Sequence, residues 1–318
     1  MDIYPILLEP RLFSRVWGGD TLPSVFASDK DLDLPLGEVW VVHGDLKCCN
    51  GVYAGCSLDD IWQRFPQDMS GKEQVPDEFP LMVKWLDTKE WLSIQVHPDD
   101  EQARLLENNP HASGKVECWY VTAVRDRGEL ICGCRDEEGV RKLAELSGRD
   151  LLPHLHRQSV RCGDFLFVPS GTIHALGPGI TVLEVQQRST ITYRFYDWDR
   201  QPRAGVERPL HLRQARQAWL YSSRVSLHGG RHPELELGRL LTANVFFAQE
   251  LIEVNGELTW DYQGLEMIIV LDAACQVSLG GSTVEVKPWG TVILPAAGSR
   301  VSLRVSEKAH VMRVMCPQ

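Results

Sequence analysis

Three polar side chains alternate along a short run that has the pattern of a β-strand. Ser93, Gln95 and His97 occupy every second position, and aliphatic residues fill the positions between them. Because successive side chains of a strand point to opposite faces, these polar groups project together. Such a face is more often exposed to solvent than catalytic, but the next run also alternates and sets Lys115 and Glu117 on one face. Imidazole, carboxylate and amine groups on neighbouring strands can bind a cation and transfer protons.

A second histidine, His174, ends a motif rich in glycine and proline. Gly163, five residues, Pro169, one residue, Gly171, two residues and His174 follow one another. This is the spacing of the second metal motif of cupins, in which the proline and glycine turn the chain and the histidine enters the mouth of the barrel. A lone histidine beside a turn is usually structural. Since the other elements of the motif stand at their required offsets, we predict that His174 is a metal ligand.

Together these segments offer two imidazoles, a carboxylate and an amide oxygen, from His97, His174, Glu117 and Gln95. This set suits Zn²⁺ or another divalent first-row ion, with a position left for water or substrate. Two histidines and one carboxylate also resemble the facial triad of non-haem iron oxygenases. Ligand composition alone does not distinguish the two kinds of site.

The elements that must position these groups are mainly strands. Short apolar or alternating runs punctuated by Gly and Pro favour a barrel or jelly roll. The predicted strands are Glu38 to Val42, Leu81 to Leu86, Trp91 to Val96, Cys118 to Val124, Phe165 to Val168, Thr181 to Val185 and Thr192 to Tyr196. Helical spacing interrupts them at Asp99 to Asn108, at Glu137 to Leu155 with a break at Gly148, and at Leu210 to Ser222.

The pattern changes after Gly230, where strands follow one another without helices. They are predicted at Ala243 to Val254, Glu266 to Asp272, Cys275 to Leu279, Thr283 to Val286, Thr291 to Pro295 and Val301 to Val305. We therefore predict a mainly β protein with two cupin-type jelly-roll barrels. A catalytic domain with helical insertions spans residues 1–235, and a smaller all-β domain without metal ligands spans 236–318. Gly290 to Pro295 echoes Gly163 to Pro169, which suggests that the domains repeat one fold.

Composition narrows the range of partners. The 318 residues include 43 acidic and 33 basic side chains, a net charge of -10. This excess argues against nucleic acid or an anionic membrane as partner but leaves a small anionic ligand open. No apolar run is long enough to span a bilayer, and the N-terminus lacks the pattern of a signal peptide. Nine cysteines without framework spacing indicate free thiols, and we predict a cytoplasmic location.

The motifs above, with others along the chain, resemble the type I mannose-6-phosphate isomerases of the shorter bacterial form, in the cupin superfamily. The resemblance covers most of the chain and is densest from Pro80 to Arg200. Each fingerprint is weak alone, but their order and spacing are highly specific. The fingerprints are Trp17 to Gly19, Gly37 to Trp40, Phe79 to Leu81, Lys84 to Asp87, Ser93 to Asp100, Gly114 to Tyr120, Pro169 to Gly177 and Tyr193 to Arg200.

The resemblance implies a metal-dependent isomerase that interconverts mannose 6-phosphate and fructose 6-phosphate. It implies one Zn²⁺ per chain and a monomer or homodimer that binds a phosphosugar and neither nucleic acid nor membrane. The zinc ligands fall on Gln95, His97, Glu117 and His174, and the shorter enzymes are usually described by the last three.

The resemblance also assigns the remaining site residues. It places the active-site arginine at Arg194, further polar groups at Lys115 and Glu184, and the phosphate contacts at Ser93 and Lys84. Aldose–ketose interconversion moves a proton between C2 and C1 through an enediol. The metal would act as a Lewis acid and Arg194 as a fixed cation near the reacting oxygens. Either Lys115, with a pKa lowered by the metal, or Glu184 would transfer the proton.

Structural alternatives exist for these assignments. Arg194 could pair with Asp197 or Asp199, and Glu184 could be a buried acid balanced by Arg188. Two other functions also stay open for the whole chain. One is an iron-dependent cupin oxygenase, and the other is a sugar-binding cupin without turnover.

Overall fold

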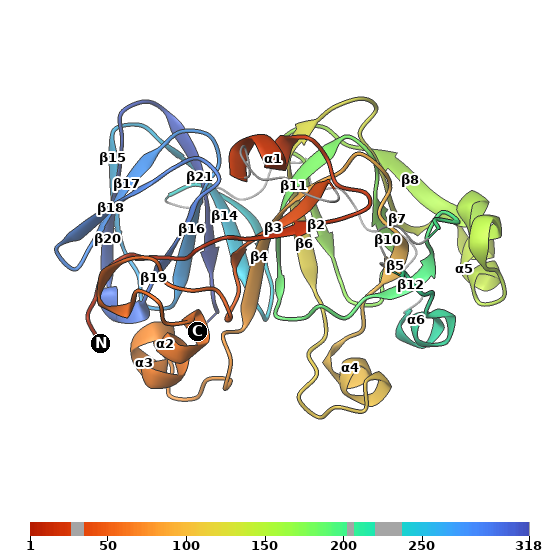
Figure 1. The fold of residues 1–318 in the computed structure, drawn as a ribbon, viewed down its shortest axis with the longest axis horizontal. Coiled ribbons are helices and arrows are strands. Elements are labelled where there is room, and N and C mark those ends of the chain that lie inside the picture. The colour runs from red at the N-terminus through yellow and green to blue at the C-terminus, as the bar shows by residue number, and fades with distance from the viewer. Residues whose placement is uncertain (27–34, 202–206, 220–236, 318) are drawn as a thin grey trace. The chain divides into compact units, whose positions relative to one another are not determined.

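The computed structural model describes residues 1–26, 35–201, 207–219 and 237–317. The chain divides into two compact units. The unit that we call the site unit comprises residues 12–40 and 81–229, and the second unit comprises residues 1–11, 41–80 and 230–318. Figure 1 shows both as sets of antiparallel strands.

Two antiparallel sheets build the site unit. The six-stranded sheet has the order β2-β3-β4-β11-β6-β9, and the five-stranded sheet has the order β12-β5-β10-β7-β8. The strands are β2 (Arg11–Ser14), β3 (Leu36–Val42), β4 (Leu81–Asp87), β5 (Ile94–Val96), β6 (Glu117–Val124), β7 (Glu129–Cys134), β8 (Leu155–Ser159), β9 (Phe165–Val168), β10 (His174–Leu176), β11 (Ile180–Gln187) and β12 (Tyr193–Tyr196). One apolar cluster joins both sheets, with Trp119 and Val182 from the first and Cys132 and Leu176 from the second. Such packing is typical of a jelly roll.

The outer face of the five-stranded sheet is covered by helices. Ile94 and Val96 of β5 pack there with Leu143, Leu151 and Ala215 in one apolar cluster. The helices of the site unit are α1 (Thr21–Phe26), α4 (Asp100–Leu106), α5 (Glu137–Leu143), the 3₁₀ helix Gly148–His154 and α6 (Leu212–Ala218). The polar residues between the aliphatic ones of this sheet therefore face the interior, which is the alternation that the sequence predicts.

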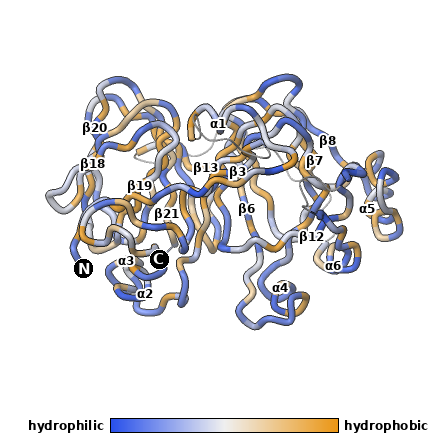
Figure 2. The backbone as a smooth tube through the Cα atoms, viewed as in Figure 1, coloured by the Kyte–Doolittle hydropathy of each residue, from blue (hydrophilic) through white to orange (hydrophobic). Residues whose placement is uncertain are grey.

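The second unit has the same kind of architecture. Its sheets have the orders β1-β19-β16-β21-β14-β13 and β15-β20-β17-β18, and Ile268, Val277 and Leu303 belong to the apolar cluster that joins them. Figure 2 shows hydrophobic residues along the strands and hydrophilic residues in the loops. The elements are β1 (Ile6–Leu7), the 3₁₀ helix Gly51–Tyr53, α2 (Leu58–Arg64), α3 (Pro66–Ser70), β13 (Arg239–Ala243), β14 (Ala248–Val254), β15 (Glu257–Asp261), β16 (Glu266–Val270), β17 (Cys275–Leu279), β18 (Ser282–Val286), β19 (Thr291–Leu294), the 3₁₀ helix Ala296–Gly298, β20 (Arg300–Val305) and β21 (Ala309–Met315).

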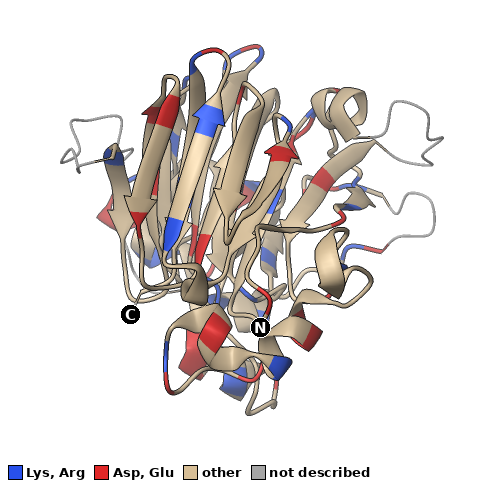
Figure 3. Cartoon of the chain, turned by 90° about the vertical axis from the view of Figure 1, so that its left-hand side faces the viewer, with Lys and Arg blue, Asp and Glu red and all other residues tan. Residues whose placement is uncertain are grey.

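Charges of both signs are interspersed on the exposed strands of the second unit, as Figure 3 shows. Arg304 of β20 pairs with Glu257 of β15 at 2.8 Å, and Arg300 pairs with Asp261 at 3.3 Å across the same two strands. Exposed pairs of this kind contribute little to stability. No helix in the described part of the chain is both long and apolar enough to cross a membrane.

The predicted fold class is confirmed: the chain is mainly β, with two jelly-roll barrels and helical insertions. The predicted domain limits differ from the observed units. The boundary between residues 235 and 236 lies outside the described residues, and residues 1–11 and 41–80 group with the second unit. The reason is long-range pairing, because Ile6 of β1 lies opposite Ile293 of β19.

Two predicted helices are longer than the observed ones. The segment predicted as helix to Leu155 forms α5, breaks before Gly148 as expected, and enters β8 at Leu155. The predicted helix from Leu210 is observed as α6, and its predicted end at Ser222 lies outside the described residues. Not predicted from the sequence were the strands β1, β2, β7, β8, β10, β13, β15 and β21 and the helices α1, α2 and α3.

Candidate metal centre

The three main candidate ligands are brought together by both sheets of the site unit. His97 directly follows β5, His174 begins β10, and Glu117 begins β6 of the other sheet. His174 lies opposite Gln95 because β10 pairs with β5. Gly171, with a φ of 78° that favours glycine, donates its N–H to the carbonyl oxygen of His97 at 2.8 Å. The turn of the glycine- and proline-rich motif thus fixes one histidine beside the other.

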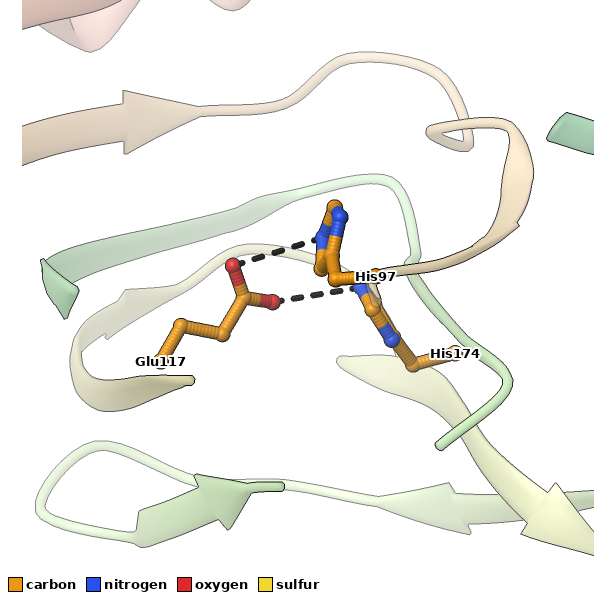
Figure 4. Close-up of side chains that lie close together, drawn as sticks. All are labelled: His97, Glu117 and His174. Atoms are coloured by element: carbon orange, nitrogen blue, oxygen red, sulfur yellow. Dashed lines mark ion pairs between the residues drawn. The ribbon is translucent and has the colours of Figure 1, made fainter. Parts of the chain in front are cut away.

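The Glu117 carboxylate faces both imidazoles (Figure 4). Its Oε2 lies 3.5 Å from His97 Nε2, and its Oε1 lies 3.1 Å from His174 Nε2. The donor atoms of the three residues all lie within 4.8 Å of one another, and all three side chains are buried. We call this group the His97–Glu117–His174 cluster.

The hydrogen bond that each histidine makes through Nδ1 fixes its tautomer. It leaves Nε2, the nitrogen that faces the carboxylate, without a proton in the neutral ring. His97 Nδ1 lies 2.8 Å from the carbonyl oxygen of Ile191, and His174 Nδ1 lies 2.9 Å from that of Thr172. A carbonyl oxygen only accepts, so each Nδ1 donates and each Nε2 of a neutral ring keeps a lone pair. Lone pairs that face carboxylate oxygens are favourable when a cation joins them, and backbone carbonyls commonly orient metal-binding histidines in this way. The cluster therefore fits a divalent metal.

The charges in the cluster match this interpretation. Burial, reinforced by the positive charge of Lys115, holds the pKa of His97 well below its usual value, so the ring is neutral at pH 7. Burial alone would raise the pKa of the Glu117 carboxyl, but Lys115 and the two histidines together hold it well below its usual range. A neutral imidazole and an ionised carboxylate are the forms that bind metals.

Gln95 adjoins the cluster with its amide nitrogen. Its Nε2 lies 3.3 Å from His174 Nε2, and its Oε1 accepts a hydrogen bond from Ser93 Oγ at 3.0 Å. The amide oxygen, which is the atom that could bind a metal, therefore points toward Ser93. Ligation by Gln95 requires the amide group to turn over.

Lys115 links the cluster to a second buried carboxylate. Its Nζ contacts Glu117 Oε2 and lies 3.1 Å from His97 Nε2 and 3.6 Å from Glu184 Oε1. Lys84 Nζ lies 3.0 Å from Glu184 Oε2. The negative charge of Glu184 is thus compensated by two lysines. These contacts differ from the structural alternative, in which Arg188 compensates that charge.

Both groups proposed for proton transfer have shifted pKa values. Burial alone would lower the pKa of Lys115. The negative charges of Glu117 and Glu184 raise it by more, so the net shift of the pKa is upward. Burial raises the pKa of the Glu184 carboxyl, and the opposing effect of Lys115 and Lys84 is smaller. Both pKa values are therefore raised, and buried titratable groups with shifted pKa values are common at functional sites.

Arg194 lies on the strand next to β5, opposite Gln95. The charge of Asp197 acts on Arg194, but the ion pairs of Asp197 are with Arg200 and Arg208, and that of Asp199 is with another arginine. Burial, followed by the positive charge of Arg208, lowers the pKa of Arg194. An arginine in this position keeps its charge available to a ligand.

The remaining candidate residues line one cavity of about 470 Å³, large enough for a phosphosugar. Six of the nine predicted site residues belong to its wall: Lys84, Ser93, Gln95, Lys115, Glu184 and Arg194. The cluster residues are buried just behind Gln95 and Lys115. All nine predicted residues are therefore brought together.

Several wall residues were not singled out in the sequence. Arg15 donates to Glu38 Oε1 at 2.8 Å, and Trp40 Nε1 donates to Glu38 Oε2 at 3.0 Å. Burial would raise the pKa of Glu38, but Lys84 and Arg15 lower it to about 2. The alternation of Glu38 and Trp40 within one fingerprint was a usable signal. For Arg15, the only signal was its position just before another fingerprint.

Comparison with known proteins gives a consistent result. Residues 6–118 match the family model described as phosphomannose isomerase type I, catalytic domain. The chain is 34% identical to the probable mannose-6-phosphate isomerase GmuF of Bacillus subtilis, over 92% of this chain and 94% of that protein. It is 33% identical to the mannose-6-phosphate isomerase of Streptococcus mutans, over 92% of each chain.

A solved structure agrees with these relatives. The crystal structure of the mannose 6-phosphate isomerase from Bacillus subtilis superposes with a TM-score of 0.85 at 30% identity, covering 98% of this chain and 99% of that one. A more distant structure, that of a protein from Archaeoglobus fulgidus, is 16% identical with a TM-score of 0.76 and shares the fold.

Proposed function

The chain belongs to the type I mannose-6-phosphate isomerase family, and we propose that it interconverts mannose 6-phosphate and fructose 6-phosphate in the cavity described above. The observation that carries this proposal is the buried His97–Glu117–His174 cluster, in which both Nε2 lone pairs face one carboxylate. Lys115 joins this cluster to the cavity wall, so groups that bind a metal and groups that move protons lie within reach of one substrate.

We propose that each chain binds one Zn²⁺ through His97, Glu117 and His174, with Gln95 as a fourth ligand if its amide turns over. Two imidazoles and a carboxylate are typical of zinc sites that keep a position for substrate. When bound, the ion acts as a Lewis acid that stabilises negative charge on the sugar oxygens at C1 and C2.

The protein's own residues then hold the substrate and move the proton. Lys115 Nζ lies 3.6 Å from Glu184 Oε1, and both side chains line the cavity. Either group can therefore exchange a proton with C1 or C2 of the open-chain sugar. Arg194 supplies a fixed positive charge beside Gln95 for the developing enediolate. The assignment of the substrate phosphate to Ser93 and Lys84 stays a prediction.

The pH dependence of kcat/KM tests whether Glu184 is the base. A carboxyl that accepts a proton must be ionised, so activity is lost as pH falls through its pKa. Because burial raises that pKa, we expect the acid limb of the profile to lie above the range of an ordinary glutamate. The Glu184→Gln variant should lose this limb. An unchanged limb in that variant would assign the base to Lys115.

The two alternative functions are less well supported. An iron-dependent oxygenase would consume oxygen, and a sugar-binding cupin would bind mannose 6-phosphate without converting it. The relatives named above are isomerases by name and match this chain over nearly its whole length, which favours isomerisation over both.

Metal removal tests the main proposal. In a coupled assay that converts mannose 6-phosphate to fructose 6-phosphate, a chelator should abolish activity and added Zn²⁺ should restore it. Metal analysis of the active protein should find about one zinc per chain. Oxygen uptake, or the absence of chelator-sensitive turnover in metal-loaded protein, would contradict the proposal.

We propose that the enzyme works in the cytoplasm on a small phosphosugar, without nucleic acid or membrane as partner. Support comes from the acidic net charge of -10 and the nine cysteines, each a free thiol. The monomeric or homodimeric state stays a prediction.

A further inference from the structure

One part of the cavity wall carries three arginines. Arg15 directly follows β2, Arg194 lies on β12, and Arg208 comes later in the chain. β2 and β12 are edge strands, one from each sheet of the site unit. The guanidinium groups of Arg208 and Arg15 both lower the pKa of Arg194, after burial as the main cause. Arg194 is therefore close enough to both other guanidinium groups to be repelled by them, and an anion among the three would be stabilised.

Carboxylates fix the orientation of two of these arginines, Arg15 and Arg208, through hydrogen bonds. Arg15 donates through Nε to Glu38 at 2.8 Å and through Nη1 to the Ser14 carbonyl at 3.2 Å. Arg208 donates to Asp197 through Nε at 2.6 Å and through Nη2 at 3.2 Å. An arginine has five N–H groups, so each keeps donors for a ligand while its orientation is fixed. Preorganised guanidinium groups bind phosphate oxygens in pairs.

Arg194 has a hydrogen-bond donor that the described residues leave without an acceptor. Its Nε is buried and has no hydrogen-bond partner within the described residues, and a buried donor without a partner costs free energy. A ligand oxygen would remove that cost.

Lys84 and Ser93, which the sequence assigned to the substrate phosphate, already interact with other protein groups. Lys84 forms an ion pair with Glu184 at 3.0 Å and lowers the pKa of Glu38, so its charge is shared between two carboxylates. Ser93 donates its hydroxyl hydrogen to Gln95. Neither group presents an uncompensated positive charge to a phosphate dianion.

We propose that Arg15 and Arg208 bind the phosphate group of the substrate and make the enzyme specific for phosphorylated sugars, while Arg194 faces the oxygens of the reacting carbons. This inference rests on the proposed function and extends it, because it names the residues that select the substrate class. In this arrangement the sugar lies between Arg15 and Arg208 at one end and Lys115 at the other, with its reacting carbons toward the His97–Glu117–His174 cluster.

Two variants test the proposal, Arg15→Gln and Arg208→Gln, because glutamine keeps a donor for Glu38 or Asp197 but carries no charge. One charge-assisted hydrogen bond contributes enough for roughly a 10- to 100-fold change in affinity. Each variant should therefore raise the KM for mannose 6-phosphate by about that factor, and calorimetry should show the same weakening for inorganic phosphate. Isomerisation of unphosphorylated mannose at high concentration should fall by a clearly smaller factor than turnover of mannose 6-phosphate, since no phosphate contact is lost.

Two further variants serve as controls. Arg304→Gln removes an exposed arginine of the second unit that pairs with Glu257, and it should leave both substrates and phosphate binding unchanged. Ser93→Ala tests the competing assignment. Circular dichroism of each variant checks that it is folded.

The outcomes separate this inference from the proposed function. If the unaltered protein binds inorganic phosphate through Arg15 and Arg208 but converts no sugar, the arginine site stands and the isomerase proposal fails. The inference is overturned if Arg15→Gln and Arg208→Gln keep their phosphate affinity, or if they lose turnover of mannose and of mannose 6-phosphate equally. Weakening of phosphate binding in Ser93→Ala alone would also overturn it.

Discussion

The Glu117→Gln variant is expected to lose most of its bound metal and to show kcat reduced by on the order of 10³-fold or more. Glu117 is the carboxylate that both imidazoles face, at 3.1 and 3.5 Å. A neutral amide of the same size removes the negative charge that attracts the cation but preserves the packing. Metal content and steady-state kinetics in metal-buffered solution measure the two effects together.

A matched control for this variant is Glu266→Gln, which neutralises a buried carboxylate of the second unit. Glu266 lies beside Arg313 and accepts a hydrogen bond from Trp260 at 3.1 Å, far from the candidate ligands in sequence. This change should lower stability without lowering metal content or the kcat of the folded protein. Full metal content in Glu117→Gln would contradict the assignment of Glu117 as a ligand.

The Lys115→Met variant is expected to lose activity for a different reason. Loss of a positioned acid–base group typically costs about 10²- to 10⁴-fold in kcat. Metal binding should be retained or become tighter, because the Lys115 ammonium lies next to Glu117 and 3.1 Å from His97 Nε2 and repels a cation there. Kinetics at saturating Zn²⁺ and metal titration of the same sample distinguish this pattern from that of a ligand variant.

The comparison for Lys115 is Lys89→Met, since Lys89 is an exposed lysine that pairs with Asp20 at 3.2 Å. It should keep kcat within about twofold, as expected for an exposed pair. If Lys115→Met retains kcat but raises KM, then Lys115 binds substrate and does not transfer the proton, and Glu184 becomes the base.

Local sequence patterns were sufficient to predict residues that the structure brings together in the His97–Glu117–His174 cluster. Strand alternation correctly put Ser93, Gln95 and His97 on one face, because the period of two is a property of the backbone itself. The aliphatic residues between them lie under α5 and α6, which explains why the polar face is interior rather than exposed. The spacing from Gly163 to His174 is also local, since a turn depends on residues adjacent in the chain.

Long-range pairing could not be predicted in the same way. No local sequence pattern shows that β1 pairs with β19, and so the prediction of a single boundary at 235 did not anticipate that residues 1–11 group with the second unit. Short strands such as β1 and β10 were missed because they carry too few residues for a periodic signal.

The sequence alone therefore determined the class of fold, the ligand types and the strand faces that carry them, because each depends on backbone geometry over a few residues. Only the tertiary structure decided which charges compensate one another. The ion pairs that connect Arg15 with Glu38, Lys84 with Glu184, and Lys115 with Glu184 join segments that are separated in the chain. Their partners depend on strand order and register, which the whole barrel fixes at once, and this is why Arg15 and Arg208 of the cavity wall were found only in the folded protein.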